Sequence, residues 1–323
     1  MVKIILKSVF AFAISILFFT ACNDTTNESE AIKIGIIVPL TGELGSYGKN
    51  IEDGAKLAVE VLKKDSIDVD LILADSKGQT KEGISLLQKM INIDRCKYFI
   101  GDISSTVTLA MLPVIESNKV FLFSPGAATP KLTNSSKYFA RNWPSNIEEA
   151  NSAAEYTFNK MKHKNVCIVY VNNDWGIGLQ ENFEKKFISL GGKILSSEIY
   201  QYENKDFKTI LLKLNSKKPE CIYLAGNQKE MGIFMKQFGE AKLNIPIISN
   251  TTFLEDDCLK VAGVFAEGVI IPTPAYKAND STSQSILTFY NAFKLKYGKE
   301  PSLVDANGYD GIMLIVKGIK EKG

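Results

Sequence analysis

The chain has 323 residues, of which 45% are hydrophobic and 23% charged, and its 38 Lys and Arg residues nearly balance its 36 Asp and Glu residues. This mixture is typical of a globular protein with two domains of ordinary size, and it shows no basic stripe of the kind that nucleic acid requires. The single histidine, His163, argues against a His-based catalytic triad and against a zinc site with several His ligands.

The first 22 residues have the pattern of an export signal. Lys3 and Lys7 precede an apolar run over residues 9–19, and a wholly polar stretch follows over residues 23–30. The run is too short to cross a membrane, because a spanning helix needs about 20 apolar residues. The pattern therefore predicts a cleaved signal peptide and not a membrane helix.

Cys22 stands at the boundary of this signal, directly after the small residue Ala21. This position resembles the lipobox of bacterial lipoproteins, in which the thiol becomes lipid-modified and cleavage precedes it. An ordinary signal peptide with an incidental cysteine is the alternative. We expect a lipoprotein signal peptide over 1–22, lipidation at Cys22, and a polar tether over 23–31.

Short apolar runs alternate with amphipathic stretches from residue 31 onward. In the first part of the chain the periodicity predicts strands at 32–38, 69–74, 98–101 and 120–123 and helices at 50–64, 81–93 and 106–117. After a pause over 138–147 it predicts strands at 166–171, 193–199, 221–225, 245–248 and 268–271 and helices at 180–190, 207–215, 230–238, 283–297 and 309–320. The Pro-Thr-Pro segment 272–274 suits an extended crossing between two lobes. The alternation predicts an α/β fold in two units, each a parallel sheet with helices on both faces.

Small polar residues follow two of the strands predicted in the first unit. Ligands of open α/β sheets bind beyond the carboxyl ends of the strands, so these residues are candidates for a binding site. Ser104 and Ser105 begin a helix, where hydroxyl groups serve as caps and free backbone N–H groups favour an anion such as a carboxylate. Gly126 lies in a loop of small residues after the next strand, where a ligand can approach the backbone closely.

Two aromatic residues, Tyr47 and Trp175, lie in Gly-flanked loops after other predicted strands. Core packing explains such positions poorly, and stacking on a ligand or contact between lobes suits them better. The chain has no P-loop, no complete dinucleotide fingerprint and no nucleophile elbow. We therefore expect a binding site without catalytic residues, without a metal and without a cofactor.

The cysteines after the signal are too widely spaced for a metal or redox motif. We expect them to be buried free thiols, although an exported location also permits a disulfide. They are Cys96, Cys167, Cys221 and Cys258.

Several segments together resemble the type I periplasmic binding proteins, specifically the branched-chain amino acid (Leu/Ile/Val) binding family of ABC importers. In chain order the matching segments are 34–42, 47–48, 53–60, 98–101, 104–105, 124–127, 173–176, 206–207 and 308–310. No single segment is specific, but their order and spacing are. The resemblance implies two doubly wound parallel-sheet lobes joined by a hinge, with lobe 1 at 31–143 plus 274–323 and lobe 2 at 144–273.

The resemblance also implies roles for the candidate residues. The Ser105 hydroxyl would bind the α-carboxylate of the ligand, and the Gly126 carbonyl would accept from its ammonium group. Tyr47 and Trp175 would line the cleft between the lobes.

This chain departs from the family pattern at two binding positions. The family has a hydroxyl residue in the loop after residues 124–125, where an ungapped count places Ala128 and a shift of one residue places Thr129. The acid of the second lobe that pairs with the ammonium aligns near Thr251. Because an unpaired ammonium in a closed cleft is costly, this loss weakens the case for an α-amino acid ligand. Asn227 follows another strand of the second lobe and could supply a neutral hydrogen bond instead.

A third departure concerns length, since family members continue for some tens of residues beyond the helix that begins near residue 309. The continuation would complete lobe 2, so the resemblance implies either a fragment or a trimmed lobe.

Export, two α/β units and polar groups after strands favour an extracytoplasmic solute-binding protein. Such a protein would deliver a small polar ligand to ABC permease subunits by closure of the cleft. We expect an amino acid of the branched-chain type, or a related small carboxylate or amide, as the ligand. We expect a monomer that is lipid-anchored to the bacterial cell membrane, on its periplasmic or extracellular face. A ligand-sensing receptor module that signals to a separate partner chain is the alternative.

Overall fold

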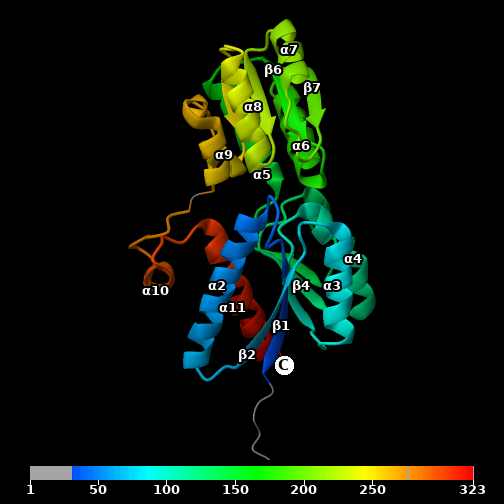
Figure 1. Ribbon diagram of the computed structural model, residues 1–323, viewed down its shortest axis with the longest axis vertical. Coiled ribbons are helices and arrows are strands. Elements are labelled where there is room, and N and C mark those ends of the chain that lie inside the picture. The colour runs from blue at the N-terminus through cyan, green and yellow to red at the C-terminus, as the bar shows by residue number, and fades with distance from the viewer. Residues whose placement is uncertain (1–30, 275, 323) are drawn as a thin grey trace, which may run out of the picture.

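The computed structural model describes residues 31–274 and 276–322, so Cys22 and the predicted signal peptide lie outside the described residues. The described chain forms two parallel sheets, and Figure 1 shows them in two bodies, one above the other. The predicted α/β class is therefore confirmed. In the following, lobe 1 is the sheet that contains β1 with its helices, and lobe 2 is the sheet that contains β6 with its helices.

The sheet of lobe 1 has the strand order β2-β1-β3-β4-β5. Its strands are β1 (Ile32–Val38), β2 (Val69–Asp75), β3 (Tyr98–Gly101), β4 (Phe121–Ser124) and β5 (Phe139–Arg141). Its helices are α2 (Gly45–Lys64), α3 (Thr80–Asn92), α4 (Ser105–Asn118), the short turn η1 (Pro130–Leu132), α10 (Gln284–Tyr297) and α11 (Leu303–Lys322). Along β1, Ile34 and Ile36 pack with α2 and α11, whereas Ile37 packs with α3 and α4. The continuous apolar run of β1 is thus explained by burial on both faces.

The sheet of lobe 2 has the strand order β7-β6-β8-β9. Its strands are β6 (Asn165–Val171), β7 (Lys193–Tyr200), β8 (Cys221–Ala225) and β9 (Ile247–Ser249). Its helices and helical turns are α5 (Asn146–Glu155), η2 (Tyr156–Lys160), α6 (Asp174–Ser189), α7 (Lys208–Lys217), α8 (Gln228–Glu240), η3 (Thr251–Leu254), α9 (Asp256–Ala262) and η4 (Gly263–Ala266). Cys167 and Val169 of β6 pack with α7, α8 and α9, and Val166 and Ile168 pack with α5 and α6.

The strand predicted at 268–271 is wrong. Only Ile270 bridges to Ile248 of β9, because Gly268 takes a φ of +82° and Pro272 has no N–H to continue a ladder. The helix α6 begins earlier than predicted because a side chain caps it. The Asn173 Oδ1 accepts from the Gly176 N–H at 2.7 Å, which starts α6 at Asp174.

Apart from the short helical turns, one strand and two helices were not predicted, namely β5, α5 and α9. The buried face of α5 is formed by Ala150, Ala153 and Ala154, which give too weak an apolar pattern to predict a helix. The sequence at the start of α5 does indicate a helix N-terminus, since Ser145 precedes Glu148 by three residues in the manner of a capping box. The Ser145 hydroxyl caps the helix by accepting from the Ile147 N–H.

The four cysteines predicted to be buried free thiols are buried and free in the structure.

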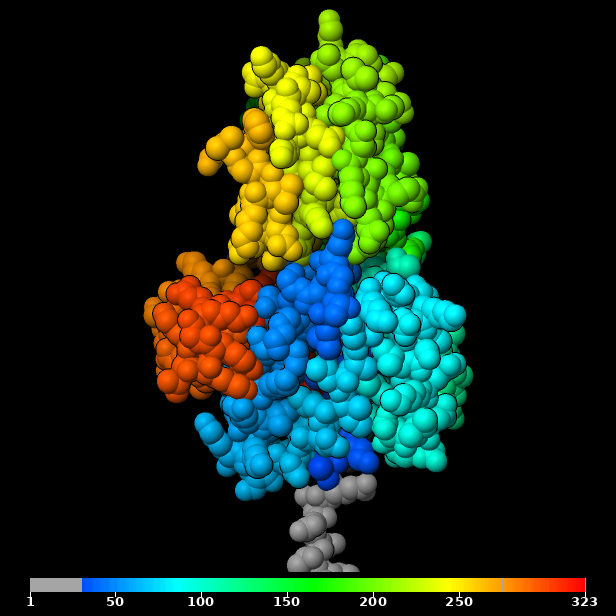
Figure 2. Space-filling model, in the orientation of Figure 1, coloured from blue at the N-terminus to red at the C-terminus, as the bar shows by residue number. Residues whose placement is uncertain are grey.

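The chain passes from lobe 1 to lobe 2 after β5 and returns between η4 and α10. Figure 2 shows a waist between the two bodies, where blue atoms of the early part of lobe 1 reach the upper body. The lobes also meet where α6 contacts η1 and α4, since Asp174 Oδ1 pairs with Lys131 Nζ at 2.7 Å and Asp174 Oδ2 accepts from Thr106 Oγ1 at 3.1 Å. The carboxyl ends of both sheets therefore face a common space.

Candidate functional site

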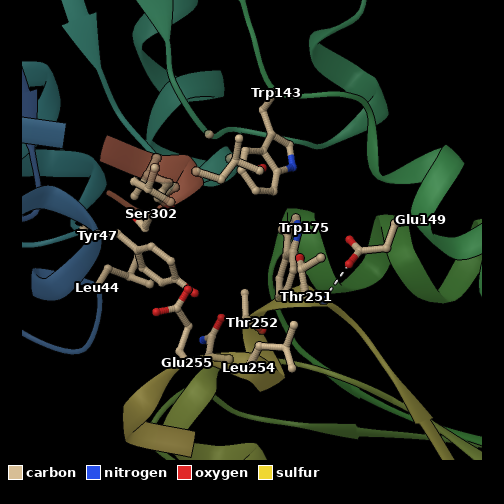
Figure 3. Close-up of a pocket in the computed structure, with 18 of the residues that line it drawn as sticks. Leu44, Tyr47, Trp143, Glu149, Trp175, Thr251, Thr252, Leu254, Glu255 and Ser302 are labelled. Atoms are coloured by element: carbon tan, nitrogen blue, oxygen red, sulfur yellow. Dashed lines mark hydrogen bonds between the residues drawn. The ribbon is translucent and has the colours of Figure 1, made fainter. Parts of the chain in front are cut away.

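A cleft of about 540 Å³ lies between the two lobes, and residues from both lobes line it. Figure 3 shows side chains of lobe 1, such as Tyr47, facing side chains of lobe 2, such as Glu255 and Thr252. Pockets of this size hold small organic ligands. Seven of the predicted site residues line the cleft, namely Tyr47, Ser104, Ser105, Gly126, Trp175, Asn227 and Thr251.

The N-terminus of α4 opens into this cleft. Ser104 caps the helix by accepting from the Val107 N–H, and the buried Asp102 carboxylate accepts from the Ser104 N–H at 2.7 Å. Ser105 is 3% exposed, and its Oγ accepts from the backbone N–H groups of Ala128 and Thr129, each at 3.2 Å. A serine hydroxyl that accepts two hydrogen bonds still has its own proton to donate. Ser105 can therefore donate to an acceptor that enters the cleft.

Ala128 and Thr129 do not line the cleft. Both are buried behind Ser105 in the loop between β4 and η1, and Thr129 is 0% exposed. Arg141 holds this loop by donating from Nη1 to the carbonyls of Ala127 and Thr129, at 3.0 and 2.9 Å. In this structure the two residues shape the loop through their backbones and bring no side chain to the ligand space.

Aromatic and aliphatic side chains form the walls of the cleft. The aromatic set is Tyr47, Trp143, Trp175, Tyr202 and Tyr276, and the aliphatic set is Leu44, Ile103, Leu254, Leu303 and Val304. Tyr47 comes from the first turn of α2, and Trp175 comes from the first turn of α6 on the opposite lobe. Such walls suit a ligand with an apolar body.

Lobe 2 brings two predicted polar residues to the cleft. Asn227 precedes α8 and is 8% exposed, and among the described residues its Nδ2 has no hydrogen-bond partner. The Thr251 backbone N–H donates to Glu149 Oε1 at 2.6 Å, so Thr251 lies directly against a carboxylate.

Two carboxylates in the cleft, Glu149 and Glu255, were not predicted from the sequence. Glu149 lies in the first turn of α5, and Glu255 directly precedes α9, two helices that the apolar pattern did not reveal. Burial raises the pKa of both groups, with the neighbouring charge of Asp256 adding to the effect on Glu255. The Ser-x-x-Glu pattern at 145–148 could have placed Glu149 at the start of a helix, but not in this cleft.

Residues 31–323 match the family model of the periplasmic binding proteins. The chain belongs to this family. It is 29% identical to a Leu/Ile/Val-binding protein of Rhizobium johnstonii over 302 residues, which cover 90% of this chain and 80% of the relative. Its fold is similar to that of the leucine binding protein LivK of Thermotoga maritima, with a TM-score of 0.84, 25% identity, and coverage of 90% of this chain and 83% of that one.

A second solved structure is similar over the same extent. It is a solute binding protein of an ABC transporter from Rhodopseudomonas palustris, in complex with 3,4-dihydroxybenzoic acid. The TM-score is 0.78 with 26% identity, and the match covers 90% of this chain and 81% of the other. The periplasmic binding proteins similar to this chain thus include proteins named for amino acids and a protein that holds an aromatic acid.

A second pair of carboxyl groups lies where the two lobes meet, outside the set of residues that line the cleft. Glu43, in the loop before α2, lies against Glu230 in the first turn of α8. Glu230 Oε1 accepts from the Glu203 N–H at 2.8 Å, while Glu43 Oε2 and Glu230 Oε2 are buried and have no other partner among the described residues. Burial and the neighbouring Glu230 raise the pKa of Glu43 from 4.5 to about 7, against the opposing charge of Lys229.

We expect the contact between the lobes of this periplasmic binding protein to weaken as the pH rises. Because the pKa of Glu43 is raised in the contact, the stabilisation is complete below pH 4.5 and is lost as the pH approaches about 7. Glu43 is partly exposed, so we discount the effect to roughly a tenfold rise in the open population. Small-angle scattering of the ligand-free protein at pH 5 and pH 8 should show a larger radius at pH 8, and Glu43→Gln should remove the difference. Equal radii for the wild-type protein would refute the expectation.

Among the described residues, no group of three or more His, Cys, Asp or Glu side chains is arranged to hold a metal ion. None of the described helices has the length and the apolar character that a membrane crossing requires.

Proposed function

We propose that this protein is an extracytoplasmic solute-binding protein that delivers a small ligand to an ABC importer. The observation that carries the proposal is the cleft between the lobes, where the N-terminus of α4 and Ser105 face aromatic walls and polar groups of the other lobe. An amino acid of the branched-chain type, or a related small carboxylate or amide, fits these groups. Its carboxylate would accept from the Ser105 hydroxyl and from free N–H groups of the helix. The named functions of the relatives support this reading.

The proposed mechanism is binding and closure, with no chemical step. A ligand that contacts both lobes binds the closed form better than the open form, and it therefore shifts the population towards closure. In this proposal the lobes are 31–143 plus 274–323 and 144–273, and the hinge lies in the two connections between them. The permease would recognise the closed form.

The proposed location is the outer face of a bacterial membrane, where the protein acts as a monomer on a lipid tether. The support for the tether is the position of Cys22 at the boundary of the export signal. A single acyl chain binds membranes only marginally, so the anchor would need the several chains that lipoproteins carry.

Ser105→Ala is expected to abolish most of the ligand-induced rise in melting temperature. A ligand at 100 times its Kd stabilises by about 2.7 kcal/mol through mass action, and loss of a hydrogen bond to a charged group should weaken binding roughly 10- to 100-fold. Thermal-shift screening of the mature protein against amino acids, amides and small carboxylates measures this effect.

The change in melting temperature on adding ligand is the relevant quantity, because the Ala128 and Thr129 N–H groups lose their acceptor and the ligand-free variant is itself less stable. Ser117→Ala is the matched control, since Ser117 lies in the same helix but is exposed and bonds only locally. An undiminished shift in Ser105→Ala would mean that the carboxylate binds elsewhere.

A further inference from the structure

The charged side chains that line the cleft are all acidic. Among the lining residues, all of which the structure describes, Glu149 and Glu255 are the ionisable acids, and none is Lys, Arg or His. Neither carboxylate forms a salt bridge with a described residue. Carboxylates in a cleft that closes need a cation or hydrogen-bond donors, because desolvation of an unpaired charge is costly. The ligand is the available source of that cation.

Glu149 is the carboxylate that remains free to bind a ligand. Its Oε1 accepts from the Thr251 N–H at 2.6 Å, which fixes the side chain against η3 of the same lobe. An ionised carboxylate has about four acceptor sites, so further donors can bind to the same group. Figure 3 shows the side chain beside Thr251 and near Trp175. Glu255, in contrast, lies next to the buried hydroxyl of Tyr47 from the other lobe.

Other polar groups in the cleft are hydrogen-bond donors that lack an acceptor. Ser105 has a hydroxyl proton to donate, and Asn227 is 92% buried with an Nδ2 that lacks a partner among the described residues. These groups need an acceptor, whereas Glu149 needs a donor. A ligand that satisfies both carries an acidic or carbonyl group and a protonated amine on one apolar body.

Given the proposed solute-binding role, on which this inference rests, we propose that Glu149 is a specificity-determining residue that binds a protonated amine of the ligand. The sequence suggested that the acid of the second lobe is lost at Thr251. The structure instead shows a carboxylate from a different helix bonded to the backbone of that same residue. The cleft therefore selects amine-bearing ligands over carboxylates that lack an amine.

The test uses two matched pairs of probes that differ only in the amine. L-Leucine is compared with 4-methylpentanoate, and L-phenylalanine with 3-phenylpropanoate, by isothermal titration of the mature protein. We expect the amine-bearing member of at least one pair to bind ten times or more tighter than its partner. Glu149→Gln should weaken the binding of that member roughly 10- to 100-fold and leave its partner unchanged or improved.

Glu149→Gln keeps an oxygen that accepts from the Thr251 N–H, so the local fold is retained, and a thermal melt without ligand checks this. Glu148→Gln is the matched control, because Glu148 is the exposed neighbour in the same turn of α5 and should leave the preference intact. Equal or tighter binding of the acids without an amine, or an unchanged preference in Glu149→Gln, would overturn this inference alone. No binding of any of the four probes at millimolar concentration would overturn the proposed ligand class together with it.

Discussion

Replacement of Asp102 with Asn should remove a large part of the pH dependence of the stability of lobe 1. Asp102 follows β3 and is 0% exposed. One carboxylate oxygen accepts from the Ser104 N–H at 2.7 Å, and the other accepts from the Ser76 hydroxyl. Burial raises its pKa from 3.8 to about 7, although these hydrogen bonds act in the opposite direction.

The sign of the effect follows from the raised pKa in the folded state. The native state prefers the protonated acid, so its contribution to stability is complete below pH 3.8 and is lost as the pH rises to about 7. Between pH 5 and pH 8 the wild-type protein should lose about 3 kcal/mol from this group, since one pKa unit corresponds to about 1.4 kcal/mol. An Asn side chain stays neutral at both values and can still accept from Ser104 and donate to Ser76.

Guanidinium unfolding of the wild-type protein and Asp102→Asn at pH 5 and pH 8 measures this difference. The two proteins should be similar at pH 5, and the variant should be more stable at pH 8. Asp257→Asn is the control, because Asp257 is exposed at the start of α9 and its replacement should leave the wild-type pH profile. If Asp102→Asn lost stability at both pH values by the same amount, the carboxyl group would be ionised in the native state.

The backbone carbonyl of Asp102 also supports the candidate site. The carbonyl of Asp102 accepts from the hydroxyls of Thr108 at 2.9 Å and Ser124 at 2.7 Å, so it holds α4 and the end of β4 together. Ser104 and Ser105 are presented to the cleft by this buried network. A binding group on a rigid, buried support keeps its orientation while the lobes move.

The elements that the sequence predicted well are those with strong apolar patterns. The strands at 32–38 and 221–225 agree with β1 and β8, because a central parallel strand is buried on both faces and reads as a continuous apolar run. The helix α5 was missed because alanines form its buried face, and α9 was missed because it is only seven residues long. Where small residues form the buried face of a helix, the apolar periodicity is too weak to predict that helix.

The candidate site was predictable only in part for a related physical reason. Residues that directly follow strands, such as Ser105 and Gly126, can be assigned to the carboxyl edge of a sheet from the sequence alone. Glu149 belongs to a helix of lobe 2, and it reaches the cleft because Thr251, about a hundred positions later, lies against it. Such a pairing depends on the tertiary arrangement of α5 and η3, which no local pattern encodes.

Gly54→Ala should strongly destabilise lobe 1. An added Cβ at Gly54 would lie 1.9 Å from the Asp305 carbonyl oxygen and 2.8 Å from the Tyr309 nitrogen, both of them backbone atoms of α11. Because backbone atoms of a packed helix cannot rotate away, α2 and α11 would have to separate. We expect a loss of about 3 kcal/mol or more in the free energy of unfolding, the upper end of the usual cost of overpacking.

Gly318→Ala is the matched control. Gly318 lies in α11, the helix that packs against Gly54, and an added Cβ there meets no atom within 4 Å. That variant should be neutral or gain up to about 1 kcal/mol, because alanine favours a helix over glycine. The start of α11 also lines the cleft through Leu303 and Val304, so separation of the helices should reduce ligand affinity as well as stability. Thermal melts and titrations of both variants test the two effects together. A Gly54→Ala protein that melts like the wild-type protein would show that α2 and α11 do not pack as closely in solution as in this structure.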